Sequence, residues 1–140
     1  MIAMLGSGCH SSQPSSASFA SVVIHNHSLA EVQQTTAQVF RENGYFSAVT
    51  GPNTMLFERE GSRANDIAYN GIAGSYYGEK SKVRVRGEVV ELGGNSWRLQ
   101  CQAFMVRNAG DSFFEEESRL TQLRAGPYQR MLNETAKRLQ

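Results

Sequence analysis

The strongest periodic pattern in the chain is an amphipathic helix that begins after residue 28. Ser28 and Glu31 have the spacing of a capping box, in which the serine hydroxyl accepts the amide of the third helical residue and the glutamate accepts the Ser28 amide. Apolar residues then recur three or four positions apart as far as Phe40. Gly44 follows, and glycine readily adopts the left-handed conformation that closes a last turn. The pattern therefore predicts a helix between these two ends.

Short apolar runs on both sides of this helix predict strands. The stretch SFASVVIHN at 18–26 has β-branched residues at its centre and predicts the first strand. Residues 46–50 and 54–59 predict two more strands, because Gly51-Pro52-Asn53 between them is a turn sequence.

A long hairpin is the clearest sheet signal, with strand 82–92 before Gly93-Gly94-Asn95 and strand 96–107 after it. With a three-residue loop, Leu92 lies opposite Ser96, and one face of the hairpin contains only small or apolar residues. The pairs on that face are Val83 with Met105, Val85 with Ala103, Gly87 with Cys101 and Val89 with Leu99. A two-residue loop would shift the register by one residue and mix polar with apolar side chains, which is costly where one face is buried. We therefore predict the three-residue loop.

The C-terminal part of the chain combines an ambiguous segment with a second clear helix. Apolar residues between Asp111 and Leu123 have a helix-like spacing, but a short strand at Phe113–Glu117 is also open. Pro127 suits the first turn of a final helix. The stripe that this helix would bury consists of Tyr128, Met131, Leu132, Thr135, Ala136 and Leu139.

The order of these elements predicts the fold class. It is an α+β domain, in which an antiparallel sheet of four to five strands is formed in the order strand, helix, strands, helix. Both helices are expected on one face of the sheet, as a two-layer sandwich. In this element order the chain resembles helix-grip domains and other two-layer α+β sandwiches.

Length and charge narrow the class of protein further. The 140 residues give room for one domain. The 14 Lys and Arg nearly balance the 13 Asp and Glu, whereas a nucleic-acid-binding surface usually has a surplus of positive charge. No apolar run approaches the roughly 20 residues of a membrane-spanning helix. The composition therefore argues against a nucleic-acid partner.

The first residues differ in composition from the rest of the chain. Apolar Met1–Leu5 precedes the small residues Gly6-Ser7-Gly8, Cys9 and a serine-rich stretch without charged side chains. This segment resembles the end of a bacterial lipoprotein signal, although the family has Leu at the position of Gly6. The resemblance implies a lipid attached at Cys9 and a lipid-anchored location in the bacterial cell envelope, at the outer membrane or cell surface.

The same contrast divides the chain into two parts. Residues 1–17 are expected to form the lipoprotein-like leader and a flexible serine-rich tether, because uncharged Ser-rich sequences behave as flexible linkers. Residues 18–140 are expected to form the single α+β domain.

The candidate chemical groups in this domain are few. His25 and His27 end the first predicted strand, where alternation would point both rings to one side. Two imidazoles fall short of the three or four ligands of a zinc site, so we expect neither a metal nor another cofactor. Cys101 is expected to face inward opposite Gly87, as a small core residue rather than a nucleophile.

Three arginines are the candidate contact surface. Arg84, Arg86 and Arg98 share the outer face of the predicted hairpin. They are either a solvated face or a contact surface for an anionic partner, such as a lipid headgroup or an acidic protein patch. The carboxylates of 115–117 are expected to be solvated, since their spacing does not fit a metal loop.

These observations favour a non-enzymatic binding or structural module of a cell-envelope lipoprotein, with an envelope protein, wall component or lipid headgroup as its partner. Two alternatives stay open: a carrier of an apolar small molecule between the sheet and the C-terminal helix, and an enzyme with an unidentified site. A deep apolar cavity lined by Trp97 or the helix stripe would favour the carrier. Converging titratable residues with shifted pKa values would favour the enzyme.

Overall fold

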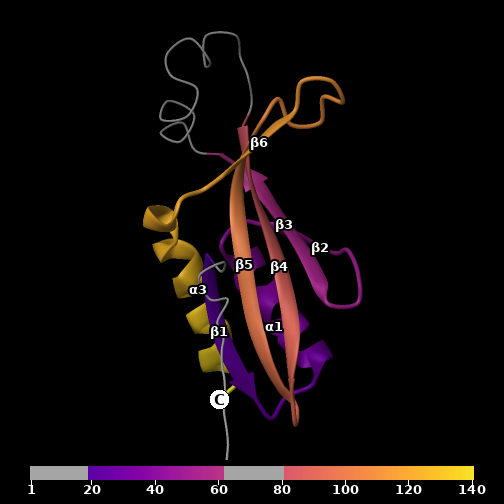
Figure 1. Ribbon diagram of the computed structural model, residues 1–140, viewed down its shortest axis with the longest axis vertical. Helices are drawn as coiled ribbons and strands as arrows, with labels where there is room; N and C mark the ends of the chain where they lie inside the picture. Colours follow the sequence, from indigo (N-terminus) through magenta and orange to yellow (C-terminus); the bar gives the residue numbers. More distant parts are fainter. Residues whose placement is uncertain (1–18, 62–80) are drawn as a thin grey trace, which may run out of the picture.

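The structure is a computed structural model that describes residues 19–61 and 81–140 (Figure 1). Cys9 and the rest of the lipoprotein-like leader therefore lie outside the described residues. In chain order the elements are β1 (Ala20–His25), α1 (Leu29–Glu42), β2 (Phe46–Val49), β3 (Thr54–Glu60), β4 (Ser81–Gly93), β5 (Ser96–Arg107), β6 (Glu116–Arg119), the 3₁₀ helix η2 (Gln122–Arg124) and α3 (Gly126–Arg138). No helix among the described residues is long and apolar enough to cross a membrane.

The sheet confirms the predicted α+β class and antiparallel pairing, with six strands rather than four or five. Its order is β1-β5-β4-β3-β2, and every neighbouring pair is antiparallel. β6 pairs with Phe104–Arg107 at the end of β5, beyond the part of β5 that pairs with β1. β1 and β6 therefore follow one another along the same side of β5, and β2 forms the opposite edge (Figure 1).

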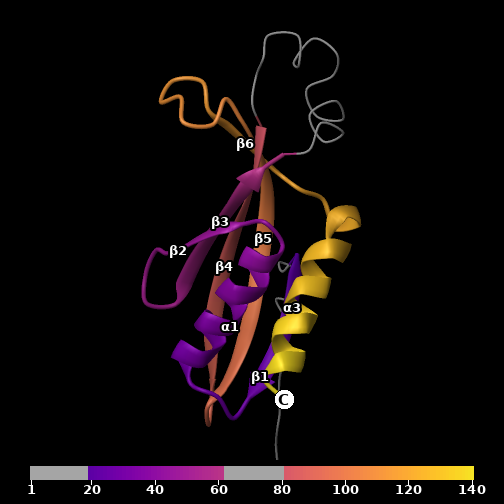
Figure 2. The same ribbon diagram turned by 180° about the vertical axis from the view of Figure 1, so that it is seen from behind.

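The two helices begin where the sequence predicts. The Ser28 hydroxyl accepts the Glu31 amide at 3.2 Å, and the Glu31 carboxylate accepts the Ser28 amide at 2.9 Å, so the capping box is confirmed. α3 has Pro127 in its first turn. The side chains of α3 that are buried are Tyr128, Met131, Leu132 and Thr135, all from the predicted stripe. In Figure 2 both helices lie in front of the sheet.

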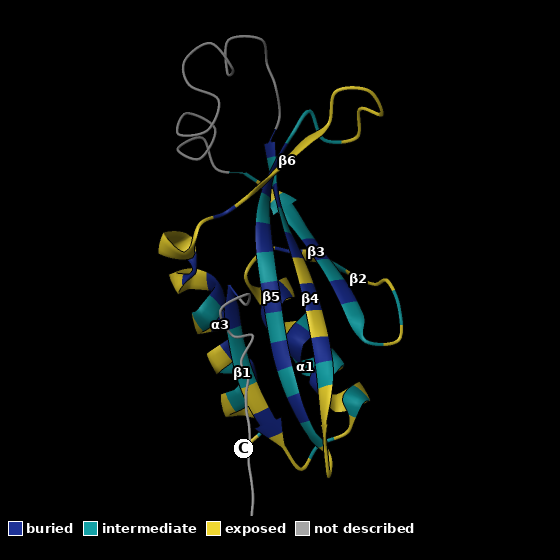
Figure 3. Ribbon diagram, in the orientation of Figure 1, coloured by how far each residue is buried: buried dark blue, intermediate teal, exposed yellow. Residues whose placement is uncertain are grey.

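One face of the sheet carries the core. Buried and more exposed residues alternate along β4 and β5, because successive side chains of a strand point to opposite faces (Figure 3). The helices pack on the buried face, where the rings of Phe40 on α1 and Phe57 on β3 stack with their centroids 4.1 Å apart. Strand residues buried on this face are Ala20, Ile24, Met55, Phe57, Val83, Val85, Val89, Trp97, Leu99, Cys101, Ala103 and Met105. These strand residues form one hydrophobic core cluster with the buried residues of the helices.

The hairpin has the predicted register but not the predicted loop. Val83, Val85, Gly87 and Val89 pair with Met105, Ala103, Cys101 and Leu99, as expected. The loop, however, has two residues, because Gly93 rather than Leu92 pairs with Ser96. A bulge between Glu91 and Gly93 absorbs the extra residue. Because of the bulge, the loop can be short while one face of the hairpin still contains only small or apolar residues. Neither of the two regular registers compared from the sequence contains a bulge.

Backbone conformation explains why the short loop is preferred. Gly94 and Asn95 both have positive φ, of 60°, as the central residues of a type I′ turn require. Gly93 has φ 96°, which only glycine adopts readily. The Gly-Gly-Asn sequence thus supplies the bulge residue and both turn residues.

The helix-like interpretation of residues 111–123 is wrong. The Asp111 carboxylate accepts the amides of Phe113 and Phe114 at 2.9 and 3.1 Å, which folds a turn instead of a helix. β6 and then η2 follow. The alternative of a short strand is right in kind, although the strand begins at Glu116 rather than at Phe113. The spacing failed as a signal because both phenylalanines are exposed.

Candidate functional site

A cleft of about 520 Å³ lies between the sheet and the helices, where α1 ends and α3 begins. Both helices and strands β3, β4 and β5 contribute to its walls. Its described lining residues are Val39, Asn43, Tyr45, Arg59, Val83, Met105, Leu120, Arg124, Pro127, Tyr128, Arg130, Met131 and Glu134. Residues of both helices line the cleft, but Trp97 is not among the described lining residues. Trp97 packs elsewhere in the core, where its indole N–H donates to the His27 carbonyl at 2.7 Å.

The floor of the cleft is apolar. Val83 of β4 and Met105 of β5 lie opposite each other in the register, and both point to the helix-covered face. Leu120 and Met131 extend this surface from the segment after β6 and from α3. The flexible methionine side chains suit a floor that adapts to ligands of different shape.

Arg59 places a positive charge in this apolar surface. It follows Met55 and Phe57 at every second position of β3, so it is the last residue of that strand to face the helices. Its guanidinium carbon lies 5.1 Å from the centroid of the Tyr45 ring, within the range of a cation–π interaction. One terminal nitrogen donates to the Asn43 carbonyl at 3.5 Å, a weak hydrogen bond. The buried Nε has no hydrogen-bond partner within the described part of the chain.

Two tyrosines complete the inner wall. The pKa of Tyr45 is raised well above its ordinary value, chiefly by burial and then by the nearby Tyr128, while Arg59 acts in the opposite direction. The Tyr45 hydroxyl therefore stays protonated over the physiological range and can act as a hydrogen-bond donor. Phe19 packs on the far side of Tyr128 with ring centroids 5.3 Å apart, which fixes that ring.

The rim of the cleft is net positive. Arg124, Arg130 and Arg59 contribute guanidinium groups to the lining, and Glu134 is the one carboxylate among the described lining residues. That carboxylate already accepts the Nε of Arg138 at 2.9 Å. Among the described lining residues, three arginines therefore stand against one carboxylate that is already paired.

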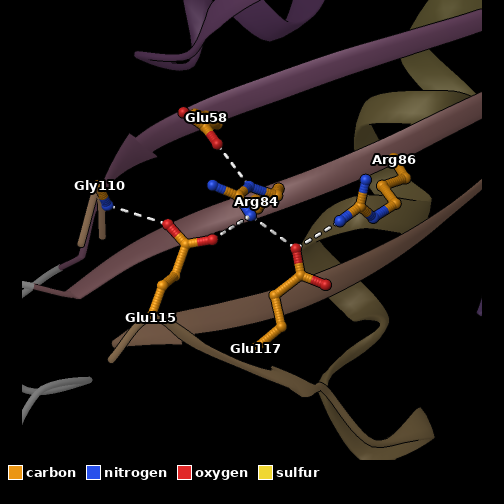
Figure 4. Close-up of polar contacts among 6 residues, drawn as sticks. All are labelled: Glu58, Arg84, Arg86, Gly110, Glu115 and Glu117. Atoms are coloured by element: carbon orange, nitrogen blue, oxygen red, sulfur yellow. Dashed lines mark hydrogen bonds and ion pairs between the residues drawn. The ribbon is translucent and has the colours of Figure 1, made fainter. Parts of the chain in front are cut away.

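The arginines predicted as a contact surface are placed differently. Arg84 lies on the outer face of β4, where its guanidinium contacts Glu58 at 2.5 Å, Glu117 at 2.7 Å and Glu115 at 3.2 Å (Figure 4). Arg86 contacts the same Glu117 carboxylate. Burial by itself would lower the pKa of Arg84, but the three carboxylates outweigh it and the pKa is raised. With only 16% of its side chain exposed, Arg84 is occupied by the chain's own carboxylates.

The turn after β5 builds this ion-pair cluster. The amide of Gly110 donates to Glu115 at 2.9 Å, and this hydrogen bond, followed by the contact with Arg84, lowers the pKa of Glu115 (Figure 4). The sequence singled out both the arginines and the carboxylates, but not their pairing. Arg98 lies apart from the cluster, opposite Val90 of β4 and Val23 of β1.

The two histidines of the domain contact different elements. Nδ1 of His25 lies 2.8 Å from the Ser96 hydroxyl. Nε2 of His27 donates to the Leu139 carbonyl at 2.6 Å, and its Nδ1 lies 3.3 Å from Glu31. Strand alternation does not relate the two rings, because β1 ends at His25 and the next residue has a positive φ. Within 19–61 and 81–140, no three His, Cys, Asp or Glu residues are grouped as metal ligands.

Cys101 takes the predicted inward position. It is buried opposite Gly87, and burial raises the pKa of the thiol to about 12. A thiol that is protonated and shielded at neutral pH is a poor nucleophile. Cys101 is thus part of the core and not of the cleft.

The chain matches no protein-family profile, no curated protein and no solved structure. The sequence predicted inward-facing positions for Val83, Met105, Tyr128 and Met131, but Arg59 was not singled out, although one signal was present. A lone Arg59 at the end of the alternating pattern Met55, Phe57 places a cation on the apolar face.

Proposed function

We propose that this domain is a non-enzymatic binding module whose ligand is an amphipathic anion held in the cleft between the sheet and the helices. The anionic group lies against Arg59 and Arg130, and the apolar body lies on Met105 and Met131. This is the carrier alternative with a charged ligand in place of a purely apolar one. The volume of about 520 Å³ supports it, because small-molecule sites usually measure about 300–1,000 Å³.

The placement of the Arg59 guanidinium in the apolar lining of the cleft, beside the Tyr45 ring, is the observation that carries the proposal. Among the described residues this guanidinium makes one weak hydrogen bond, from a terminal nitrogen to the Asn43 carbonyl at 3.5 Å, so its terminal N–H groups can still donate to a ligand. Guanidinium groups bind carboxylates and phosphates through two parallel hydrogen bonds. A ligand with either group therefore fits the terminal nitrogens of Arg59.

The composition of the lining supports binding rather than catalysis. No His, Cys, Ser or Thr is among the described residues of the cleft, so a side-chain nucleophile paired with a base is missing there. Glu134 is held by Arg138, and Tyr45 stays protonated. These groups can orient a ligand through charge and hydrogen bonds.

The proposed location of the protein in the cell depends on its N-terminal leader. We infer that a lipid is attached at Cys9 and that the serine-rich tether holds the domain near a membrane of the bacterial envelope. We also infer that the domain is a two-layer sandwich with both helices on one face of the sheet. In that arrangement the cleft opens at the end of the layer interface, where a ligand can enter without unfolding the core.

Calorimetric titration of the full chain tests the binding proposal. The probes are dodecanoate, dodecyl phosphate and, as a neutral control of the same chain length, dodecanol, all below their aggregation limits. We expect saturable one-to-one binding of both anions and binding of dodecanol at least about tenfold weaker, since a charged hydrogen bond contributes about 1.5–3 kcal/mol.

Two variants separate the cleft from general charge effects. Arg59→Gln should weaken dodecanoate binding at least about tenfold, whereas Arg98→Gln on the outer face should leave it unchanged. Equal binding of dodecanol and dodecanoate, or equal losses in both variants, would contradict the proposal.

A further inference from the structure

The β2 edge of the sheet has no described neighbour. β2 pairs with β3 on one side only, and no described strand or helix lies beyond it in Figure 1 or Figure 2. Phe46 and Val49 on this strand are 81% and 68% exposed, which is unusual for large apolar side chains. Such an edge is a template on which another strand can pair.

The backbone groups of β2 that face outward can be named from the register. The Thr50 amide donates to the Thr54 carbonyl, and hydrogen-bonded pairs alternate along antiparallel strands. The amides and carbonyls of Ser47 and Val49 therefore point away from β3. They offer two donors and two acceptors, the set that one added strand would use.

A groove of about 380 Å³ runs beside this edge, between β2 and α1. α1 contributes Ala30, Gln34 and Ala37, small or uncharged side chains that leave the groove open. Val49 pairs with the inward-facing Met55, so it points to the groove side of the sheet. The alternate side chains of an added strand would lie in the same groove.

Charge indicates what the added strand must carry. Arg41 is the one charged residue among the described groove residues, and none of them is acidic. Its Nη1 donates to the Ser47 hydroxyl at 3.1 Å, which holds the guanidinium at the end of the edge. We propose that the β2 edge binds an extended peptide segment of a partner protein, which adds a strand to the sheet, places an apolar side chain in the groove and sets a carboxylate beside Arg41.

A second copy of the chain fits this edge less well. Two β2 strands paired about a twofold axis at Ala48 would bring Arg41 of both copies to one seam, and the strand sequence FSAV has no carboxylate to meet them. The residues of the groove and the edge are also different from those that line the cleft between the sheet and the helices, so this proposal does not depend on a ligand in that cleft.

Selection from a phage library of random peptides, on the immobilised full chain, tests this proposal. The variant Val49→Pro serves for counter-selection, because proline removes the outward amide at 49 without removing a hydrogen bond to β3. We expect selected peptides to alternate apolar and polar residues around one Asp, Glu or free C-terminal carboxylate. A synthetic peptide of the selected sequence should lose at least tenfold in affinity with Val49→Pro and with Arg41→Gln.

Further variants keep the test decisive if Val49→Pro does not fold. Ala37→Trp fills the groove from a half-buried helix position and should weaken the same peptide, whereas Gln38→Trp, at an exposed position of α1 that does not line the groove, should leave binding unchanged. The proposal is overturned if no peptide is enriched over the counter-selected background, or if peptide affinity is insensitive to Ala37→Trp. It is also overturned if the chain dimerises in sedimentation experiments and Val49→Pro abolishes the dimer.

Discussion

The two edges of the sheet are protected to very different degrees. At the β1 edge, the side-chain amide of Gln129 on α3 accepts the Ser21 amide at 3.1 Å and donates to the Ser21 carbonyl at 2.8 Å. Gln122 donates to the Phe19 carbonyl at 3.0 Å, just before that strand. These side chains occupy the place of a neighbouring strand. The outward groups of Ser47 and Val49 on β2 have no such cover from the described residues.

This difference shows which edge of the sheet is protected against pairing with other chains. Natural proteins usually cover or charge a sheet edge, because unpaired backbone groups invite pairing with other chains. Here α3 covers one edge, while α1 stands back from the other and leaves a groove beside it. An edge that is left open in a protein that closes its other edge is a candidate for a regulated contact.

The largest expected effect is on the free energy of unfolding, and it differs between the two edge strands because β1 is more deeply buried than β2. Ile24 on β1 is buried in the core, so Ile24→Ala should lower the free energy of unfolding by about 2–5 kcal/mol. Val49→Ala on β2 should change it by no more than about 0.5 kcal/mol, because that side chain is largely exposed. Urea unfolding followed by circular dichroism measures both. Similar losses in the two variants would mean that β2 is buried in solution.

A smaller effect is expected when the cover of the β1 edge is removed. Gln129→Ala deletes both hydrogen bonds to Ser21 and should destabilise the domain by about 1–3 kcal/mol. Gln34→Ala, the matched change on α1 beside the β2 edge, should stay within about 0.5 kcal/mol. Thermal or urea unfolding of both variants decides the point, and equal stabilities would show that Gln129 does not close the edge.

The smallest expected effect is on the pH dependence of stability, through the ion pair between Glu42 on α1 and Arg138 on α3. Hydrogen bonds from Arg138 lower the pKa of Glu42 below its ordinary value near 4.5. The contribution of this ion pair is therefore complete above pH 4.5 and is lost as the pH falls through the lowered pKa of the folded state. Glu42→Gln should flatten the decline in stability as the pH falls below about 4.5. Glu91→Gln, an exposed carboxylate on β4, should keep the parent's decline; equal curves for both variants would argue against the pair.

Local signals predicted the parts of the fold that depend on neighbours in sequence. The capping box at Ser28 and the unmixed face of the hairpin were sufficient for α1 and for the register of β4 and β5. The bulge before Gly93 was missed because the choice lay between two regular registers. The turn at Asp111 was missed because a side-chain hydrogen bond to the backbone outweighed an apolar spacing.

The candidate sites depend on contacts that no local pattern contains. Gln129 covers Ser21 across 108 positions of the sequence, and Arg84 meets Glu117 across 33. Only the folded chain brings such pairs together, so the sequence could name the arginines and carboxylates but not their neutralisation. Arg59 was not singled out either, although its alternation with Met55 and Phe57 along the strand was a local signal for a cation on the inner face.

Hydrogen exchange of single backbone amides tests the difference between the edges most directly. In the monomeric full chain, followed by NMR, the Ser21 amide should exchange at least about tenfold more slowly than the amides of Ser47 and Val49, because it is hydrogen-bonded to Gln129. In Gln129→Ala the exchange of Ser21 should rise toward theirs. If Ser47 and Val49 exchange as slowly as Ser21 in the monomer, the β2 edge is covered in solution and the contrast between the two edges is contradicted.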